Sequence, residues 1–216
     1  MQQFWLPEPP AGAQICGGFD GSDVSDWTAI SAETREGFSF TPRYGPDRLP
    51  TIWRPEEWGG RIPRDQVDMA MDELFERYQV ARVYADPPRW ETDLERWILK
   101  HGEKHVIPWE TYRTRQMHAA LERFMVDLAE KRITQDGCPL TALAMAAARK
   151  IPKGPDKYGL AKPSQMQKID PAITRVLAHE AAADERADGW AEPVDSTVQV
   201  FRRTGGRRSR LGAQRR

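Results

Sequence analysis

The sequence lacks the features that identify several large classes of protein. It contains no run of roughly 18 apolar residues, which argues against a membrane span and a membrane partner. It contains no GxxxxGK[ST] motif and therefore no P-loop nucleotide site. No basic segment followed by an apolar one opens the chain, so we expect no secretion signal. Cysteine is scarce as well, and the two present, Cys16 and Cys138, favour a reduced, cytosolic protein.

The charges that are present are unevenly distributed. The 216 residues have a formal net charge of zero, but the final stretch RRTGGRRSRLGAQRR carries seven arginines and no acid. This leaves a net charge of about minus seven on the rest of the chain. A basic tail on an acidic body suggests a polyanionic partner such as double-stranded DNA, with a merely solubilising tail as the alternative. The arginines expected to contact DNA are Arg202, Arg203, Arg207, Arg208 and Arg210.

Composition divides the chain into three parts. Residues 1–13 are rich in proline and are interpreted as a linker or the end of a preceding domain. Residues 14–189 are long enough to form one domain with a sizeable core. Residues 190–216 form the basic, Arg-rich tail, which we expect to be flexible.

Hydrophobic periodicity predicts alternating strands and helices in the middle part. The predicted strands cover residues 14–19, 27–30, 37–41, 80–86 and 105–108, and the predicted helices cover 63–79, 90–100, 111–131, 139–150 and 170–188. Residues 42–62 are predicted to be a long ordered loop with a short strand, and residues 151–167 a loop. Strands that alternate with helices indicate an α/β fold with a parallel pair of strands.

Three aspartates occupy positions where such a fold would bring them together. Asp20 ends the first strand, Asp86 ends the strand after the first long helix, and Asp170 begins the last helix. The carboxyl ends of adjacent strands open into one crevice, and converging carboxylates repel one another unless cations lie between them. Two Mg²⁺ or Mn²⁺ ions about 3.5–4 Å apart would suit phosphodiester hydrolysis. The alternatives are local: Asp20 and Asp86 as turn residues, and Asp170 as a helix cap.

Several segments together resemble one known family, the C-terminal nuclease domain of tailed-phage terminase large subunits. The resemblance follows the same order along about residues 14–189 and is carried by GFDGSDVSDWTAI, PRDQVDMAMDELFERYQVARVYADPPRWETDLERW, RTRQMHAALERF and KIDPAITRVLAHEA. It implies an RNase H-like fold, in which a mixed central sheet is flanked by helices. It also implies a metal-dependent endonuclease that cuts concatemeric double-stranded DNA during phage genome packaging, in the cytoplasm of the host bacterium.

The resemblance also assigns roles to particular residues and suggests partners. It implies that Asp20, Asp86 and Asp170 are the catalytic, metal-binding triad. Ser22 and Asp26 would support the first aspartate in a GSxxxD pattern, and two lysines before the third aspartate would contact a phosphate or offset the carboxylate charge. Those lysines are Lys162 and Lys168. The implied protein partners are a terminase ATPase domain, the small terminase subunit and the portal.

Two departures from the family keep other functions open. Ala144 and Ala147 stand where the family carries a His and an Asn, which puts the contribution of that helix in doubt. The ATPase half of a large terminase is missing, so we interpret the chain as an excised domain, a split gene product or a stand-alone nuclease. The rival functions are an inactive nuclease-like domain that docks onto DNA or the portal, and another RNase H-like enzyme such as a resolvase or hybrid nuclease.

Aromatic residues and one histidine carry further expectations. Trp90 and Trp97 share a predicted helical face, which predicts core packing. Trp53 and Trp58 lie in the long loop and are expected to contact DNA or a partner. His179 lies on the last helix and is expected at the surface.

Overall fold

A computed structural model describes residues 5–190 and shows a central mixed sheet of seven strands. Six strands follow the order β8-β7-β1-β2-β3-β9, and β6 pairs with β2. Pairs β1–β7, β7–β8 and β3–β9 are parallel, and the pairs made by β2 are antiparallel. The strands are β1 (Gln14–Asp20), β2 (Thr28–Thr34), β3 (Phe38–Phe40), β6 (Ile52–Trp53), β7 (Gln79–Ala85), β8 (Val106–Pro108) and β9 (Thr134–Gln135).

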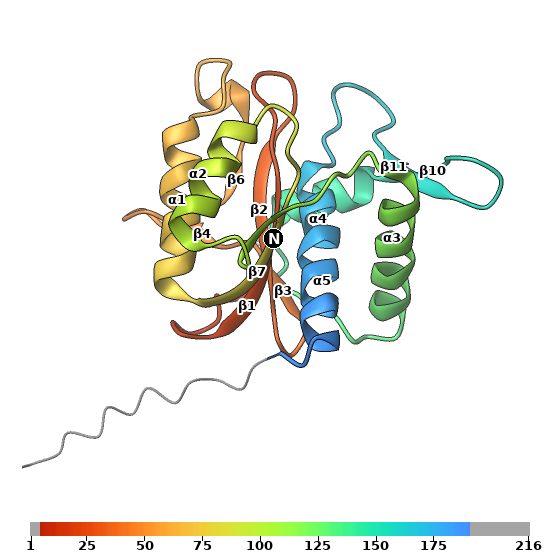
Figure 1. Cartoon of the computed structure of the whole chain (residues 1–216). Coiled ribbons are helices and arrows are strands. Elements are labelled where there is room, and N and C mark those ends of the chain that lie inside the picture. The colour runs from red at the N-terminus through yellow and green to blue at the C-terminus, as the bar shows by residue number, and fades with distance from the viewer. Residues whose placement is uncertain (1–4, 191–216) are drawn as a thin grey trace, which may run out of the picture.

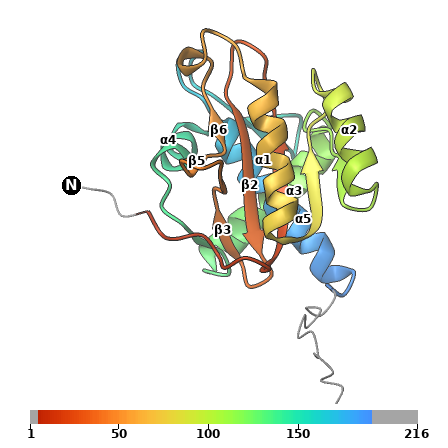
Figure 2. The ribbon, with the colours of Figure 1, turned by 90° about the vertical axis from the view of Figure 1, so that its left-hand side faces the viewer.

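Helices cover both faces of this sheet (Figures 1 and 2). One face is covered by α1 (Arg64–Arg77) and α2 (Glu91–His101). The other is covered by α3 (Thr114–Ala129), α4 (Pro139–Ala147) and α5 (Asp170–Ala187). This arrangement confirms the predicted mixed α/β sheet flanked by helices.

The core on the α1/α2 side is built around aromatic rings. Phe19 of β1 makes edge-to-face contacts with Trp90 and Trp97, with ring centroids 5.1 Å apart in both pairs. Both tryptophans are fully buried, which confirms their predicted place in the core. Such packing fixes the carboxyl-terminal half of β1 against the helix layer.

Gly18 brings α5 unusually close to β1. A Cβ atom at this position would lie 2.3 Å from the Thr174 carbonyl oxygen and 2.6 Å from the Ala178 backbone nitrogen. Any larger residue would push the helix away from the strand. Contacts from Ser31 to Thr174 and from Glu33 to His179 show that α5 runs parallel to β2 and so antiparallel to β1. The first turn of α5 therefore points toward the end of β1.

The pairing of β1 with β7 contains an irregularity. Ile15 pairs with Val80, but Cys16 pairs with Arg82, so β7 carries one extra residue at this point. Beyond it the register is regular, and Phe19 lies opposite Ala85. The two parallel strands therefore end side by side.

The prediction of a loop over residues 151–167 was wrong up to Ala161, and the helix predicted over 139–150 ends at Ala147. The chain forms an antiparallel hairpin of β10 (Arg149–Pro152) and β11 (Tyr158–Ala161), closed by a hydrogen bond from the Lys153 N–H to the Lys157 carbonyl. The hairpin strands are short and half exposed, so they carry little hydrophobic periodicity. Their stability comes from packing on α3, where Tyr158 contacts the His118 ring.

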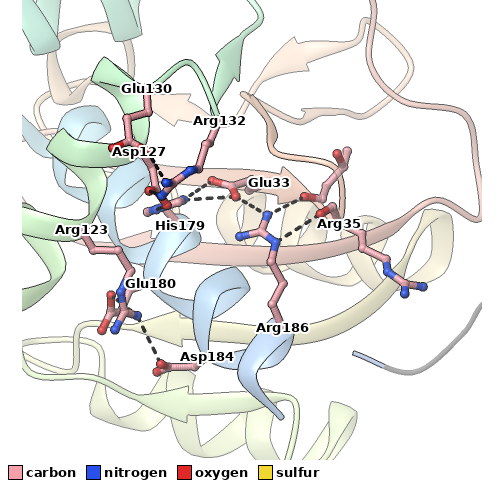
Figure 3. Close-up of polar contacts among 11 residues, drawn as sticks. Glu33, Arg35, Arg123, Asp127, Glu130, Arg132, His179, Glu180, Asp184 and Arg186 are labelled. Atoms are coloured by element: carbon pink, nitrogen blue, oxygen red, sulfur yellow. Dashed lines mark hydrogen bonds and ion pairs between the residues drawn. The ribbon is translucent and has the colours of Figure 1, made fainter. Parts of the chain in front are cut away.

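The expectations for Trp53 and His179 were also wrong. Trp53 is 1% exposed and donates a hydrogen bond to the Tyr44 hydroxyl, so it packs in the core. His179 is also 1% exposed and lies between Glu33 and Asp127 (Figure 3). Trp58 is 38% exposed, which leaves its predicted partner contact untested. The region around these tryptophans also contains β4 (Arg43–Tyr44), β5 (Leu49–Pro50) and the 3-10 helix η1 (Pro55–Glu57).

Residues 5–13 lie against the rest of the domain. The Leu6 N–H donates to the Asp136 carbonyl oxygen, and Glu8 accepts a hydrogen bond from the Arg43 N–H and pairs with Arg48. The five tail arginines predicted to contact DNA lie outside the described residues. The proposed three-part division of the chain stays a prediction.

Candidate active site

Asp20 is the last residue of β1, and Asp86 directly follows β7, its parallel neighbour. The Asp86 N–H donates a 3.0 Å hydrogen bond to the carbonyl oxygen of Phe19, the residue before Asp20, which continues the ladder one residue beyond β7. Side chains two residues apart share a face of a strand, so Asp20 lies on the same face as Gly18. Asp86 likewise shares a face with Tyr84, whose hydroxyl donates to Asp184 of α5 at 2.6 Å. Both carboxylates therefore face the α5 layer.

Asp170 begins α5 and completes this group of acids. Burial raises the pKa of Asp20 well above its usual range, and the charges of Asp170, Asp86 and Asp26 raise it further. Asp20 is therefore surrounded by acidic neighbours.

Asp170 is held in an unfavourable environment for a carboxylate. Burial, with a further contribution from Asp26, raises its pKa to about 6. Its Oδ2 atom is buried and has no hydrogen-bond partner within residues 5–190. The helix cap is Ile169, and no side-chain hydrogen bond caps the helix. The alternative of Asp170 as a simple helix cap therefore does not account for its side chain.

Thr111 positions Asp86, a role that no motif in the sequence indicated. The Thr111 N–H donates to Oδ1 of Asp86 at 3.0 Å, and the Thr111 hydroxyl donates to Oδ2 at 2.7 Å. Burial raises the pKa of Asp86, although these two bonds oppose the increase. Both oxygens are bonded to a residue 25 positions away, so Asp86 is not simply a local turn residue.

The predicted supporting residues form a network next to the three acids. The Asp26 N–H donates to the Ser22 hydroxyl at 3.1 Å, and the Asp26 carboxylate pairs with both Lys162 and Lys168. Burial disfavours ionisation of Asp26, but the lysine hydrogen bonds outweigh it and hold its pKa below the usual range. The lysines therefore offset the charge of Asp26. A phosphate contact by either lysine stays a prediction.

The donor set fits a hard divalent cation in its chemistry. Among residues 5–190, no three His, Cys, Asp or Glu side chains are grouped closely enough to hold a metal ion in their present positions. The acids around Asp20 nevertheless supply carboxylate oxygens, the ligands that Mg²⁺ and Mn²⁺ prefer, and Asp170 Oδ2 has no other partner. On α4, Ala144 and Ala147 are both buried and supply no ligand.

Comparisons with known proteins agree with this architecture. No protein-family model matches the chain. It is 29% identical over 193 residues to the Gene 13 protein of Mycobacterium phage D29, covering 84% of this chain and 31% of the relative. It is 28% identical over 185 residues to the Gene 13 protein of Mycobacterium phage L5, covering 80% and 30%. The chain spans about a third of the length of these relatives.

Solved structures show the same fold. The large terminase nuclease from thermophilic phage G20c superposes with a TM-score of 0.60 at 13% identity, covering 82% of this chain and 90% of that chain. The same nuclease has been solved with bound magnesium and with bound cobalt. The HK97 bacteriophage large terminase gives a TM-score of 0.62 at 12% identity, covering 82% of this chain and 40% of that one. The chain therefore has the fold of a tailed-phage large terminase nuclease domain, as the sequence resemblance predicted.

Proposed function

We propose that this chain is a divalent-metal-dependent endonuclease that cuts double-stranded DNA in phage genome packaging. The observation that supports it most is the position of Asp20, Asp86 and Asp170 at one end of the sheet, within a large terminase nuclease fold. The magnesium-bound and cobalt-bound structures of the G20c nuclease support a divalent cofactor. Mg²⁺ and Mn²⁺ are both candidates for the native ion.

In this proposal each residue has a distinct task. Asp20, Asp86 and Asp170 would hold the cations, which would supply charge stabilisation for the attacking and leaving oxygens of the cleaved phosphodiester. Thr111 orients Asp86 through its two hydrogen bonds. Lys162 keeps Asp26 ionised beside the site.

DNA would be bound mainly through its phosphates. Lys153 and Lys157 are exposed at the tip of the β10–β11 hairpin, which Figure 1 shows projecting from the α3 side of the molecule. The tail arginines Arg202, Arg203, Arg207, Arg208 and Arg210 would add further contacts. Binding through phosphates predicts cleavage that tolerates different sequences and weakens at high salt.

The wider assembly is part of the same proposal. An ATPase domain, the small terminase subunit and the portal are the expected protein partners, and the host cytoplasm is the expected location. Within residues 5–190, no helix has the length and apolar character needed to cross a bilayer.

Plasmid nicking tests the proposal. We expect wild-type protein to nick supercoiled plasmid with Mg²⁺ or Mn²⁺, and Asp20→Asn and Asp86→Asn to lose at least about a hundredfold in rate, since each removes a cation ligand. Asp47→Asn is the matched control, because Asp47 is exposed and distant in sequence from the site. Equal nicking by all four proteins would contradict the proposal. Four-way junctions and RNA–DNA hybrids, used as alternative substrates, separate resolvase and hybrid-nuclease activities from duplex cleavage.

A catalytically inactive docking module is the second candidate. The observation that favours it is the pair of buried alanines, Ala144 and Ala147, on α4 where the family carries polar residues. Calorimetric titration with Mn²⁺ separates the two functions. The nuclease should bind Mn²⁺ in wild type and lose that binding in Asp20→Asn, whereas a docking module should show the same weak binding in both.

A further inference from the structure

A hollow lies between the start of α3 and the β10–β11 hairpin, and Thr111, which bonds Asp86, lines it. We propose that this hollow binds a single unpaired nucleobase of the DNA substrate, next to the phosphate that is cut. The inference rests on the proposed nuclease function and adds a subsite to it. An exposed tyrosine and a lysine that has no acidic partner within residues 5–190 support the inference, because both lie at a small amphipathic cavity next to the catalytic acids.

The cavity shares its walls with the candidate active site. Thr111, which holds both carboxylate oxygens of Asp86, lines one side. Ile173 lines another, one helical turn after Asp170. A group bound in the cavity would therefore lie against Thr111, which bonds Asp86, and against Ile173, which is one helical turn from Asp170.

The size of the cavity restricts what it can accept. Its volume is about 210 Å³, below the roughly 300–1,000 Å³ of pockets that enclose drug-sized ligands. One planar base fits such a space and a base pair does not. The nucleotide must therefore leave the double helix, as in other enzymes that extrude a base.

The chemistry of the lining suits a base and its phosphate. Met117, Leu160 and Ile173 provide apolar surface for the face of a ring. Tyr112 is 69% exposed at the same cavity, and aromatic side chains of this kind stack on unpaired bases. Lys153 is exposed, and no carboxylate within the described residues pairs with it, so its ammonium is free to meet a phosphate.

The outer wall of the cavity is held in place before any ligand binds. The Tyr158 N–H donates to His118 Nδ1 at 3.3 Å, and Lys150 Nζ lies 3.3 Å from the centre of the Tyr158 ring. The first contact joins the hairpin to α3, the second lies within the hairpin, and Lys150 also pairs with Glu122 of α3 at 3.8 Å. The cavity is therefore preformed, which reduces the entropic cost of ordering it around a base.

Binding of two DNA hairpins by fluorescence anisotropy tests the inference. One is fully paired, and the other carries a single unpaired 2-aminopurine nucleotide; Ca²⁺ replaces the catalytic ion so that binding is measured without cleavage. We expect wild type to bind the hairpin with the unpaired base at least about fivefold more tightly, the lower limit for one stacked base. Tyr112→Ala should abolish this preference, and Tyr112→Phe should keep it, because the ring is retained.

Two controls separate the cavity from general DNA binding. Leu99→Ala removes another exposed side chain, on α2 across the sheet, and should leave the preference unchanged. Lys153→Ala should weaken binding of the unpaired hairpin more than Lys104→Ala, an exposed lysine just before β8. If wild type binds both hairpins equally, or Tyr112→Ala keeps the preference, the base-binding cavity is overturned and the nuclease proposal stands. If wild type binds neither hairpin, both are overturned.

Discussion

Acidic side chains in this molecule have two opposite environments. Asp136 is 2% exposed and receives hydrogen bonds from the Thr41 N–H at 2.6 Å, the Cys138 N–H at 3.1 Å and Arg175 at 2.8 Å. Asp20, at the end of β1, instead has Asp170, Asp86 and Asp26 as its charged neighbours. Asp136 therefore has a cationic partner, whereas the charged groups that shift the pKa of Asp20 are all acids.

The pKa shifts follow this difference. Burial alone would raise the pKa of Asp136, but Arg175 and the backbone N–H groups hold it below the usual range. Burial raises the pKa of Asp20, and its acidic neighbours raise it further. A buried acid with a cationic partner and backbone donors stabilises the fold, whereas acids crowded by like charges cost stability, a cost that the proposed cation site would explain.

Glu33 resembles Asp136 in that it is a buried acid with basic side chains as hydrogen-bond donors (Figure 3). Glu33 is fully buried, yet it accepts hydrogen bonds from Arg186 at 2.7 Å and from His179 at 2.9 Å. The other ring nitrogen of His179 lies 3.1 Å from Asp127. These side chains connect β2, α3 and α5 at the end of α5 away from Asp170, so they stabilise the helix that carries the third acid.

The largest effect on stability should come from removing the charge of Asp136. Asp136→Asn leaves Arg175, which is fully buried, without its charged partner. We expect the free energy of unfolding to fall by about 3–5 kcal/mol, the usual cost of removing one partner of a buried pair. Urea unfolding measures it. An unchanged midpoint would show that Arg175 finds another partner.

Divalent cations should stabilise the protein by binding to the acids around Asp20. At 100 times the dissociation constant, Mn²⁺ should raise the free energy of unfolding by about 2.7 kcal/mol, because it binds the folded state. Thermal unfolding with and without Mn²⁺ measures the change in wild type, in Asp20→Asn and in the exposed control Asp47→Asn. The increase should vanish in Asp20→Asn alone. The same increase in all three would place the cation elsewhere.

Removing one of the crowded acids should stabilise the protein when no metal is present. Asp20→Asn removes a carboxyl group whose ionisation its surroundings disfavour, so we expect the free energy of unfolding to rise by roughly 0.5–2 kcal/mol in EDTA. Urea unfolding in parallel with Asp136→Asn makes the comparison direct. A loss of stability similar to that of Asp136→Asn would show that the two environments do not differ.

Carboxyl titration followed by NMR should give the smallest but most specific difference. In metal-free protein, Asp170 should titrate near pH 6 and Asp136 below its ordinary value of about 3.9. The lowered pKa of Asp136 stabilises the fold above pH 4, and this contribution is lost as the pH falls through the folded-state pKa. The raised pKa of Asp170 acts in the opposite direction: its stabilising contribution is present below pH 4 and lost as the pH rises through about 6. Similar titration midpoints for Asp170 and Asp136 would show that their environments do not shift the two pKa values in opposite directions.

Local patterns in the sequence predicted much of this structure. The ends of β1 and β7 and the start of α5 follow turn and proline signals, so Asp20, Asp86 and Asp170 could be placed at element ends. The stripe that contains Trp90 and Trp97 has clear helical spacing, and it predicted the core correctly. Predictions of this kind need only neighbouring residues.

The remaining features depend on residues far apart in the chain. Arg175 bonds Asp136 across 39 positions, and His179 bonds Glu33 across 146. In the sequence, His179 stands between alanines and acids and looks like a surface residue. Thr111 lies in a polar stretch with no motif of its own. One missed feature did carry a signal: the Lys-Gly-Pro-Asp-Lys run at 153–157 is a turn sequence between two short strands.

The extra residue in β7 determines which changes in strand length the site can tolerate. Val80 packs in the core on the α1/α2 side, and Asp86 lies six positions later on the α5 side. Regular pleating would place both on one face, so the irregularity beside Ala81 reverses the alternation between them. Deleting Ala81 would restore a regular strand and leave Asp86 facing α5. Deleting one residue between Val83 and Asp86 would turn the aspartate toward the aromatic core, so length changes a few positions apart should have opposite outcomes.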